Sequence, residues 1–112
     1  MGAHSRTKGK VGEREVATLL RRIWPDARRG LQSRGGGAEV PDVEVPCFHV
    51  ECKRQARPNI AAAMRQAEAD AEPGRWPVAW TRADRADWLV TMRGEDWIEL
   101  VTAWWIETGR GN

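Results

Sequence analysis

Cysteine is scarce in this chain of 112 residues, which has only Cys47 and Cys52 and no Cys-x-x-Cys pair. Such a sequence indicates neither a disulfide framework nor a zinc site. The chain also lacks an apolar run long enough to span a membrane and lacks a signal-peptide pattern. We therefore expect a soluble, intracellular protein with no membrane partner.

Positive charge is unevenly distributed, although the net charge is only +2. Residues 1–35 contain nine Lys or Arg and three acidic residues, whereas the remainder contains nine and thirteen. A basic N-terminal third is typical of proteins that bind a phosphate backbone. Residues 1–9 are polar, and we expect a flexible basic arm there, acting as a DNA contact or as a solubilising tail. Residues 10–112 then form a single domain.

Three segments have the apolar spacing of helices. The first spans residues 10–24 and is ended by Pro25. The second follows Asn59, a candidate N-cap, and runs to Ala71. The third follows Arg93 and carries an apolar stripe of Trp97, Leu100, Val101, Trp104 and Trp105. The helical spacing of these tryptophans favours a core or interface role over stacking on unpaired bases.

Five segments are typical of β-strands, at residues 27–33, 40–45, 48–53, 76–81 and 87–92. The resulting order is helix, three strands, helix, two strands, helix. This order predicts an α/β fold in which a mixed central β-sheet is flanked by helices.

The second and third strand segments form a hairpin broken at Pro46 and Cys47. The two-residue period of a strand places Glu51 and Lys53 on one face of it, and Asp42 lies on the neighbouring strand. Two converging carboxylates suit a hard divalent cation such as Mg²⁺. The alternative is a surface hairpin with an ordinary Glu–Lys face. His49 shares the face of Glu51, and there a structural role across the strands competes with metal ligation.

Glu13 continues the apolar stripe of the first helix toward its N-terminus. A carboxylate facing the sheet needs a cation partner, because burying an unpaired charge is costly. A metal ion, Arg14 and Lys53 are the candidates. The alternative is a solvent-exposed Glu stabilised by the helix dipole.

Glu13, then Pro41-Asp42, then Glu51-Cys52-Lys53 resembles the PD-(D/E)xK nuclease superfamily, whose fold has a restriction-endonuclease-like core. Lys8-Gly9, Glu13-Arg14-Glu15 and Arg29 with Ser33 are similar to archaeal and phage Holliday-junction resolvases. The resemblance covers roughly residues 8–71. The chain departs from the archaeal pattern between Ser33 and Asp42, where residues 35–40 add length.

The resemblance implies a role for each matching residue. It implies metal ligation by Asp42 and Glu51, with Glu13 as a further ligand. It assigns Lys53 as the catalytic lysine and Ser33 as a residue needed for cleavage. It assigns phosphate contacts to Arg14 and to Arg29 or its neighbour Arg28. We also predict DNA contacts for three residues of the basic segments, Lys10, Arg34 and Arg54. Gln66 on the second helix is a candidate for assisting the site.

The resemblance also implies a function. We expect a homodimeric hydrolase that resolves four-way DNA junctions in DNA recombination and repair, using Mg²⁺, for which Mn²⁺ substitutes. It would act in the cytoplasm of a bacterial, archaeal or phage-infected cell. The alternatives are another nuclease of this superfamily, acting on duplex or flap DNA in nicking, repair or restriction, and a DNA-binding module with a decayed site.

Overall fold

The computed structural model describes residues 2–30 and 40–109, with side chains from Lys8 onward in the first segment. Its elements follow the predicted order of helices and strands. They are α1 (Gly2–Leu20), β1 (Arg28–Arg29), β2 (Val43–Glu44), β3 (Phe48–Arg54), α2 (Ile60–Asp70), β4 (Trp76–Arg82), β5 (Leu89–Met92) and α3 (Gly94–Glu107).

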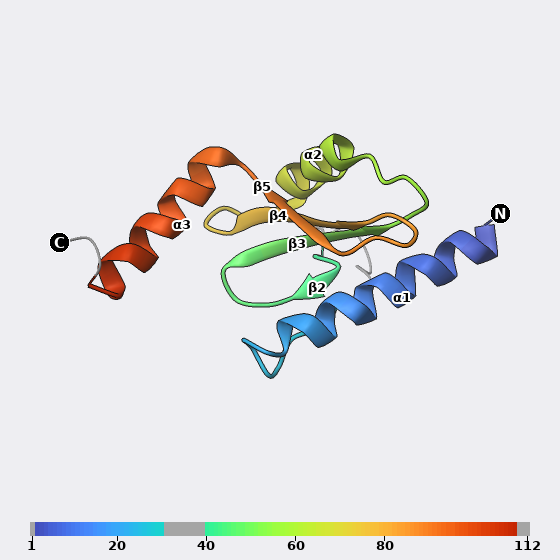
Figure 1. Cartoon of the computed structure of the whole chain (residues 1–112), viewed down its shortest axis with the longest axis horizontal. Helices are drawn as coiled ribbons and strands as arrows, with labels where there is room; N and C mark the ends of the chain where they lie inside the picture. Colours follow the sequence, from blue (N-terminus) through green and yellow to red (C-terminus); the bar gives the residue numbers. More distant parts are fainter. Residues whose placement is uncertain (1, 31–39, 110–112) are drawn as a thin grey trace.

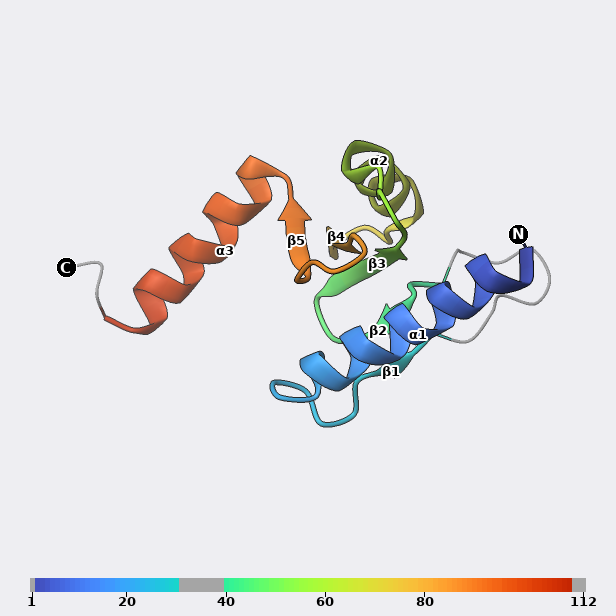
Figure 2. The same cartoon turned by 45° about the vertical axis from the view of Figure 1, so that its right-hand side comes forward.

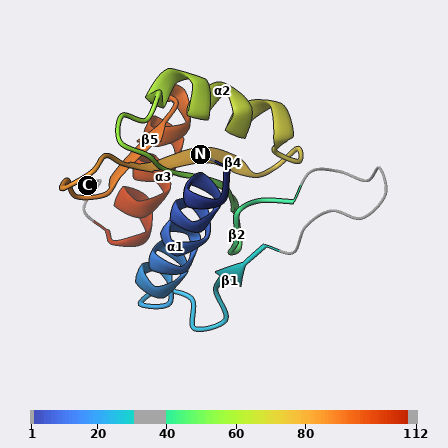
Figure 3. The same ribbon diagram turned by 90° about the vertical axis from the view of Figure 1, so that its right-hand side faces the viewer.

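The five strands form one mixed sheet in the order β1-β2-β3-β4-β5. The β3–β4 pair is parallel, with α2 as the crossover between its strands, and the other three pairs are antiparallel. The helices α1 and α2 cover opposite faces of this sheet, as Figures 1 and 3 show. The predicted α/β class with a mixed sheet flanked by helices is confirmed.

The main core lies between α1 and one face of the sheet. Val16 and Leu20 of α1 pack with Val43 of β2, Val50 of β3 and Val78 of β4. A second, smaller core of Ala63, Met64, Ala67 and Ala79 lies under α2. Because helices cover both of its faces, the middle of β3 is buried on both sides, and His49 and Glu51 on its α2 face are removed from water.

Several element boundaries differ from those predicted. Helix α1 begins at Gly2 instead of residue 10, so residues 2–9 continue the helix where a flexible arm was expected. The ion pair between Lys8 Nζ and Asp84, at 3.0 Å, anchors this extension to the loop between β4 and β5. Strand β2 is shorter than predicted, since Pro41 has no N–H to donate to a ladder.

Helix α2 begins as the sequence predicted. The Asn59 side chain accepts a hydrogen bond of 2.9 Å from the Ala62 N–H, which is N-cap geometry. Among the described residues, no helix is long and apolar enough to cross a membrane.

Helix α3 extends past the β5 edge of the sheet, away from α1 and α2 (Figures 1 and 2). None of its residues is buried. Trp97 is 55% exposed and Trp105 is 43% exposed. The predicted apolar stripe is therefore helical, but it does not belong to the core of a single chain.

Candidate functional site

Asp42 lies directly before β2 and beside β3, the strand that carries Glu51. The antiparallel register of these strands pairs Val43 with Val50 and Glu44 with His49. The Asp42 N–H donates to the Val50 carbonyl at 2.9 Å, and Asp42 Oδ2 accepts a hydrogen bond of 2.8 Å from the Cys52 N–H. The Asp42 carboxylate is thus held by the backbone of the strand that carries Glu51.

Glu51 lies in the middle of β3 and is only 4% exposed. Its Oε2 lies 3.7 Å from Lys53 Nζ, and its Oε1 lies 3.8 Å from His49 Nε2. The prediction that His49, Glu51 and Lys53 share one face is confirmed. The alternative of an exposed Glu–Lys face is wrong, because α2 covers this face of the sheet.

Glu13 approaches the hairpin from α1. Its Oε1 lies 3.0 Å from Arg29 Nη2 of β1. Arg29 was not among the candidate partners, which were a metal ion, Arg14 and Lys53. Helix α1 comes close here because Gly12 has no side chain: a Cβ on it would lie 2.8 Å from Arg54 Cβ. This glycine sets the distance between the Glu13 backbone and β3.

A cavity of about 560 Å³ joins three of the five predicted catalytic residues. Its walls include Glu13, Asp42 and Lys53, together with Cys52. Glu51 is not on the wall, but it pairs with Lys53 at the edge. The remaining wall consists mostly of basic or polar residues and backbone: Lys8, Gly9, Arg54, Gln55, Ala56 and Arg57.

The surroundings of this cavity perturb the pKa of Asp42. Burial, followed by the nearby Glu51 charge, raises the pKa of Asp42 from its ordinary 3.8 to about 7. The Glu13 charge also raises this pKa, whereas the Cys52 N–H and Lys53 lower it. Burial, followed by the charges of Asp42, Glu13 and Glu51, raises the pKa of the Cys52 thiol, which therefore stays protonated and unreactive. A raised carboxyl pKa in a cavity is a common feature of functional sites.

The two adjacent arginines of β1 point to different partners. Arg29 pairs with Glu13 at the cavity, whereas Arg28 pairs with Glu44 at 3.3 Å and is largely exposed. Of the two candidates for phosphate contact, Arg29 lies next to the predicted catalytic residues.

Other predicted residues lie elsewhere. Arg14 is exposed and lines a different cavity with Trp88, and Lys10 is exposed on α1. Gln66 is on the exposed side of α2. Ser33 and Arg34 lie outside the described residues, so their predicted roles stay predictions.

Three residues near these carboxylates were not predicted. Lys8 and Arg57 line the cavity, although Lys8 had been placed in the flexible arm. Asp70, the last residue of α2, lies against Glu51 and His49. Asp70 follows Ala67 by three residues and Ala63 by seven, so all three lie on one face of α2, and both alanines are buried. This spacing could have indicated from the sequence that Asp70 faces the sheet.

The donor set at the cavity suits a hard divalent cation. The charges of Glu51 and Glu13 both act on Asp42, Glu13 comes from α1, and all three residues offer carboxylate oxygens. A dication would also offset the repulsion that raises the pKa of Asp42. These residues fit Mg²⁺ or Mn²⁺ chemically.

Neither models of protein families, nor curated proteins, nor solved structures match this chain.

Proposed function

We propose that this protein is a Mg²⁺-dependent endonuclease that hydrolyses phosphodiester bonds in four-way DNA junctions. The observation that carries the proposal is the convergence of Glu13, Asp42 and Lys53 on one cavity, with Glu51 paired to Lys53 at its edge. Helix α1, strand β3 and the segment just before β2 supply these four residues. The proposal includes a restriction-endonuclease-like core, for which the mixed sheet between α1 and α2 is a suitable framework.

Each residue has a chemical task in this reaction. Water attacks phosphorus, the bond to the 3′ oxygen breaks, and that oxygen leaves as a hydroxyl after taking up a proton. A bound Mg²⁺ supplies charge neutralisation at the phosphate and at the leaving oxygen. Asp42 and Glu51 hold the cation, and Glu13 completes the acidic set directly or through water.

Lys53 orients the attacking water or stabilises the charge on the phosphate. Its Nζ lies 3.7 Å from Glu51 Oε2, which keeps the ammonium beside the carboxylates. From this position, Lys53 would reach both a phosphate beside the carboxylates and the water that attacks it.

The basic wall of the cavity supports a nucleic-acid substrate. Lys8, Lys53, Arg54 and Arg57 surround the acidic centre. Phosphate groups reaching the carboxylates would pass between these cations, and binding would weaken steeply with added salt. Recognition by charge and shape suits a branched DNA more than a fixed base sequence.

Helix α3 supports the proposed homodimer. Trp97, Ile98 and Trp105 are exposed, as is Ile106 at 68%. An apolar cavity of about 220 Å³ between α1 and the sheet continues this surface as far as Leu100. Aromatic residues of this kind are enriched in protein interfaces. Two copies joined here would carry two sites, as symmetric cleavage of a junction requires.

A cleavage assay tests the proposal. The protein should cut a synthetic four-way junction in Mg²⁺, and Lys53→Met or Asp42→Asn should reduce the rate by about 100-fold or more. Glu44→Gln is the matched control, because Glu44 is in the same hairpin but pairs with Arg28 outside the cavity. Equal cutting of linear duplex would favour the repair or restriction alternative. Binding without cleavage in Mg²⁺ or Mn²⁺ would favour the DNA-binding module.

A further inference from the structure

A buried histidine lies on the α2 face of β3, outside the cavity described above. His49 is 2% exposed, and within the described part of the chain no hydrogen-bond partner reaches its Nε2. An unsatisfied buried polar atom costs roughly 1–3 kcal/mol. Such an atom in a small protein, with little stability to spare, calls for a ligand or a partner.

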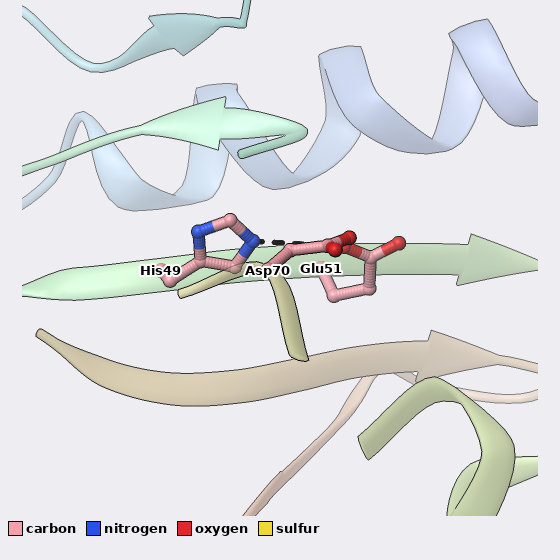
Figure 4. A group of neighbouring side chains, drawn as sticks. All are labelled: His49, Glu51 and Asp70. Atoms are coloured by element: carbon pink, nitrogen blue, oxygen red, sulfur yellow. Dashed lines mark ion pairs between the residues drawn. The ribbon is translucent and has the colours of Figure 1, made fainter. Parts of the chain in front are cut away.

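Two carboxylates face this nitrogen. Figure 4 shows the His49 ring directed toward Glu51, its neighbour but one on β3, and toward Asp70 at the end of α2. One ligand atom from each of the three residues lies within 4.8 Å of the others. His49 and Glu51 are buried, and Asp70 is partly buried.

Among the described residues, Nε2 has no hydrogen-bond partner in the absence of a cation. If Nε2 carries a proton, its distance of 3.8 Å from Glu51 Oε1 is too long for a hydrogen bond. If Nε2 is unprotonated, its lone pair faces two negatively charged groups. A divalent cation between the three side chains removes both problems, because imidazole nitrogen and carboxylate oxygen are both metal ligands.

We propose that His49, Glu51 and Asp70 form a second divalent-cation site, which takes a transition-metal ion such as Mn²⁺ or Zn²⁺ in preference to Mg²⁺. The preference follows from the nitrogen ligand, since imidazole suits transition metals better than it suits Mg²⁺. Ligand atoms bound to one tetrahedral ion at about 2.1 Å lie about 3.4 Å apart, so atoms that lie up to 4.8 Å apart must draw together by up to about 1.4 Å on binding.

Glu51 connects this second site to the proposed Mg²⁺ site. Its Oε1 faces His49, and its Oε2 faces Lys53. One carboxylate therefore bridges the two sites through different oxygens.

A cavity of about 220 Å³ lined by His49, Glu72 and Arg75 gives an ion a path from solvent to the histidine. The inference does not depend on nuclease activity, because neither His49 nor Asp70 belongs to the proposed cleavage site.

Manganese spectroscopy on the full chain tests the proposal. The experiment uses Asp42→Asn as the background, so that the proposed Mg²⁺ site does not contribute. Pulsed electron paramagnetic resonance of bound Mn²⁺ should show modulation from a directly coordinated ¹⁴N nucleus, and excess Mg²⁺ should not remove it. Adding Asp70→Asn should weaken Mn²⁺ binding by at least about tenfold, and adding His49→Gln should abolish the nitrogen signal.

Asp70→Asn decides the question if His49→Gln fails to fold, because Asp70 is at a helix end and only partly buried. The matched control is Glu68→Gln, which removes an exposed carboxylate two residues away that pairs with Arg93, and it should leave Mn²⁺ binding unchanged. Bound Mn²⁺ without nitrogen modulation, or undiminished affinity in Asp70→Asn, would overturn the proposal. Junction cleavage is measured separately, so the failure of either proposal can be distinguished from failure of the other.

Discussion

Asp42 should destabilise the metal-free protein at neutral pH, and Asp42→Asn should reverse this effect. The pKa of Asp42 is raised from 3.8 to about 7 by burial and by Glu51. The folded state therefore holds a proton on Asp42 that the unfolded chain has already lost. The stability that this proton provides is complete below about pH 4 and is lost as the pH rises through 7.

The size of the effect follows from the two pKa values. Each pKa unit corresponds to about 1.36 kcal/mol, so ionised Asp42 costs the folded state about 4 kcal/mol at pH 8. Asparagine has nearly the same shape, is neutral at every pH, and can still accept the hydrogen bond from the Cys52 N–H. Between pH 5 and pH 8, the stability advantage of Asp42→Asn over the natural protein should grow by about 3 kcal/mol.

Urea unfolding followed by tryptophan fluorescence measures this difference, in buffers from pH 5 to pH 8 with chelator present. Glu44→Gln is the control: it removes only an exposed ion pair with Arg28, worth up to about 1 kcal/mol. Its stability difference should not follow the same pH dependence. If the curves of Asp42→Asn and the natural protein stay parallel from pH 5 to pH 8, the reasoning about Asp42 is refuted.

Divalent cations link this stability effect to function. Mg²⁺ favours ionised Asp42, so it should stabilise the natural protein and leave Asp42→Asn nearly unaffected. Cation binding must displace the proton from Asp42 below about pH 7. Mg²⁺-dependent cleavage should therefore rise with pH and level off above 7 at low Mg²⁺, and saturating Mg²⁺ should shift the midpoint to lower pH.

Two further predictions concern α1 and α3. Gly12→Ala should destabilise the protein by about 1–3 kcal/mol in thermal unfolding, because its Cβ would lie 2.8 Å from Arg54 Cβ. Gly9→Ala is the matched control on the same helix. It meets nothing within 4 Å and should stabilise the protein by up to about 1 kcal/mol. Trp97→Gln should raise the dissociation constant of the proposed dimer, measured by sedimentation, by about 30-fold. Glu107→Gln on the same helix should leave this constant unchanged. A natural protein that is monomeric at micromolar concentration would contradict the dimer.

The helices were predictable from the sequence because their apolar residues recur at helical spacing. Asn59 marked the start of α2 by its side-chain chemistry, and the Trp97–Trp105 stripe marked α3. The alternation on β3 likewise placed Glu51 and Lys53 on one face. These features depend on neighbours in the chain, so the local sequence contains the information.

Tertiary packing determined the environment of each candidate residue. Arg29 is the partner of Glu13 because β1 lies at the edge of the sheet beside α1, at a place that sequence spacing does not specify. Asp70 lies against His49 because α2 crosses between parallel β3 and β4. The α3 stripe has an apolar period whether the helix is buried or exposed, and only the fold leaves it outside the core.

The hairpin of Asp42 and Glu51 shows most clearly which features depend on the local sequence and which depend on tertiary packing. The sequence by itself determined that two carboxylates and a lysine would lie near one another, since register and period fix these positions. Only the tertiary structure decided how strongly the carboxylates interact, because α1 and α2 cover the two faces of the sheet and exclude water. That exclusion raises the pKa of Asp42 and leaves His49 Nε2 without a hydrogen bond among the described residues.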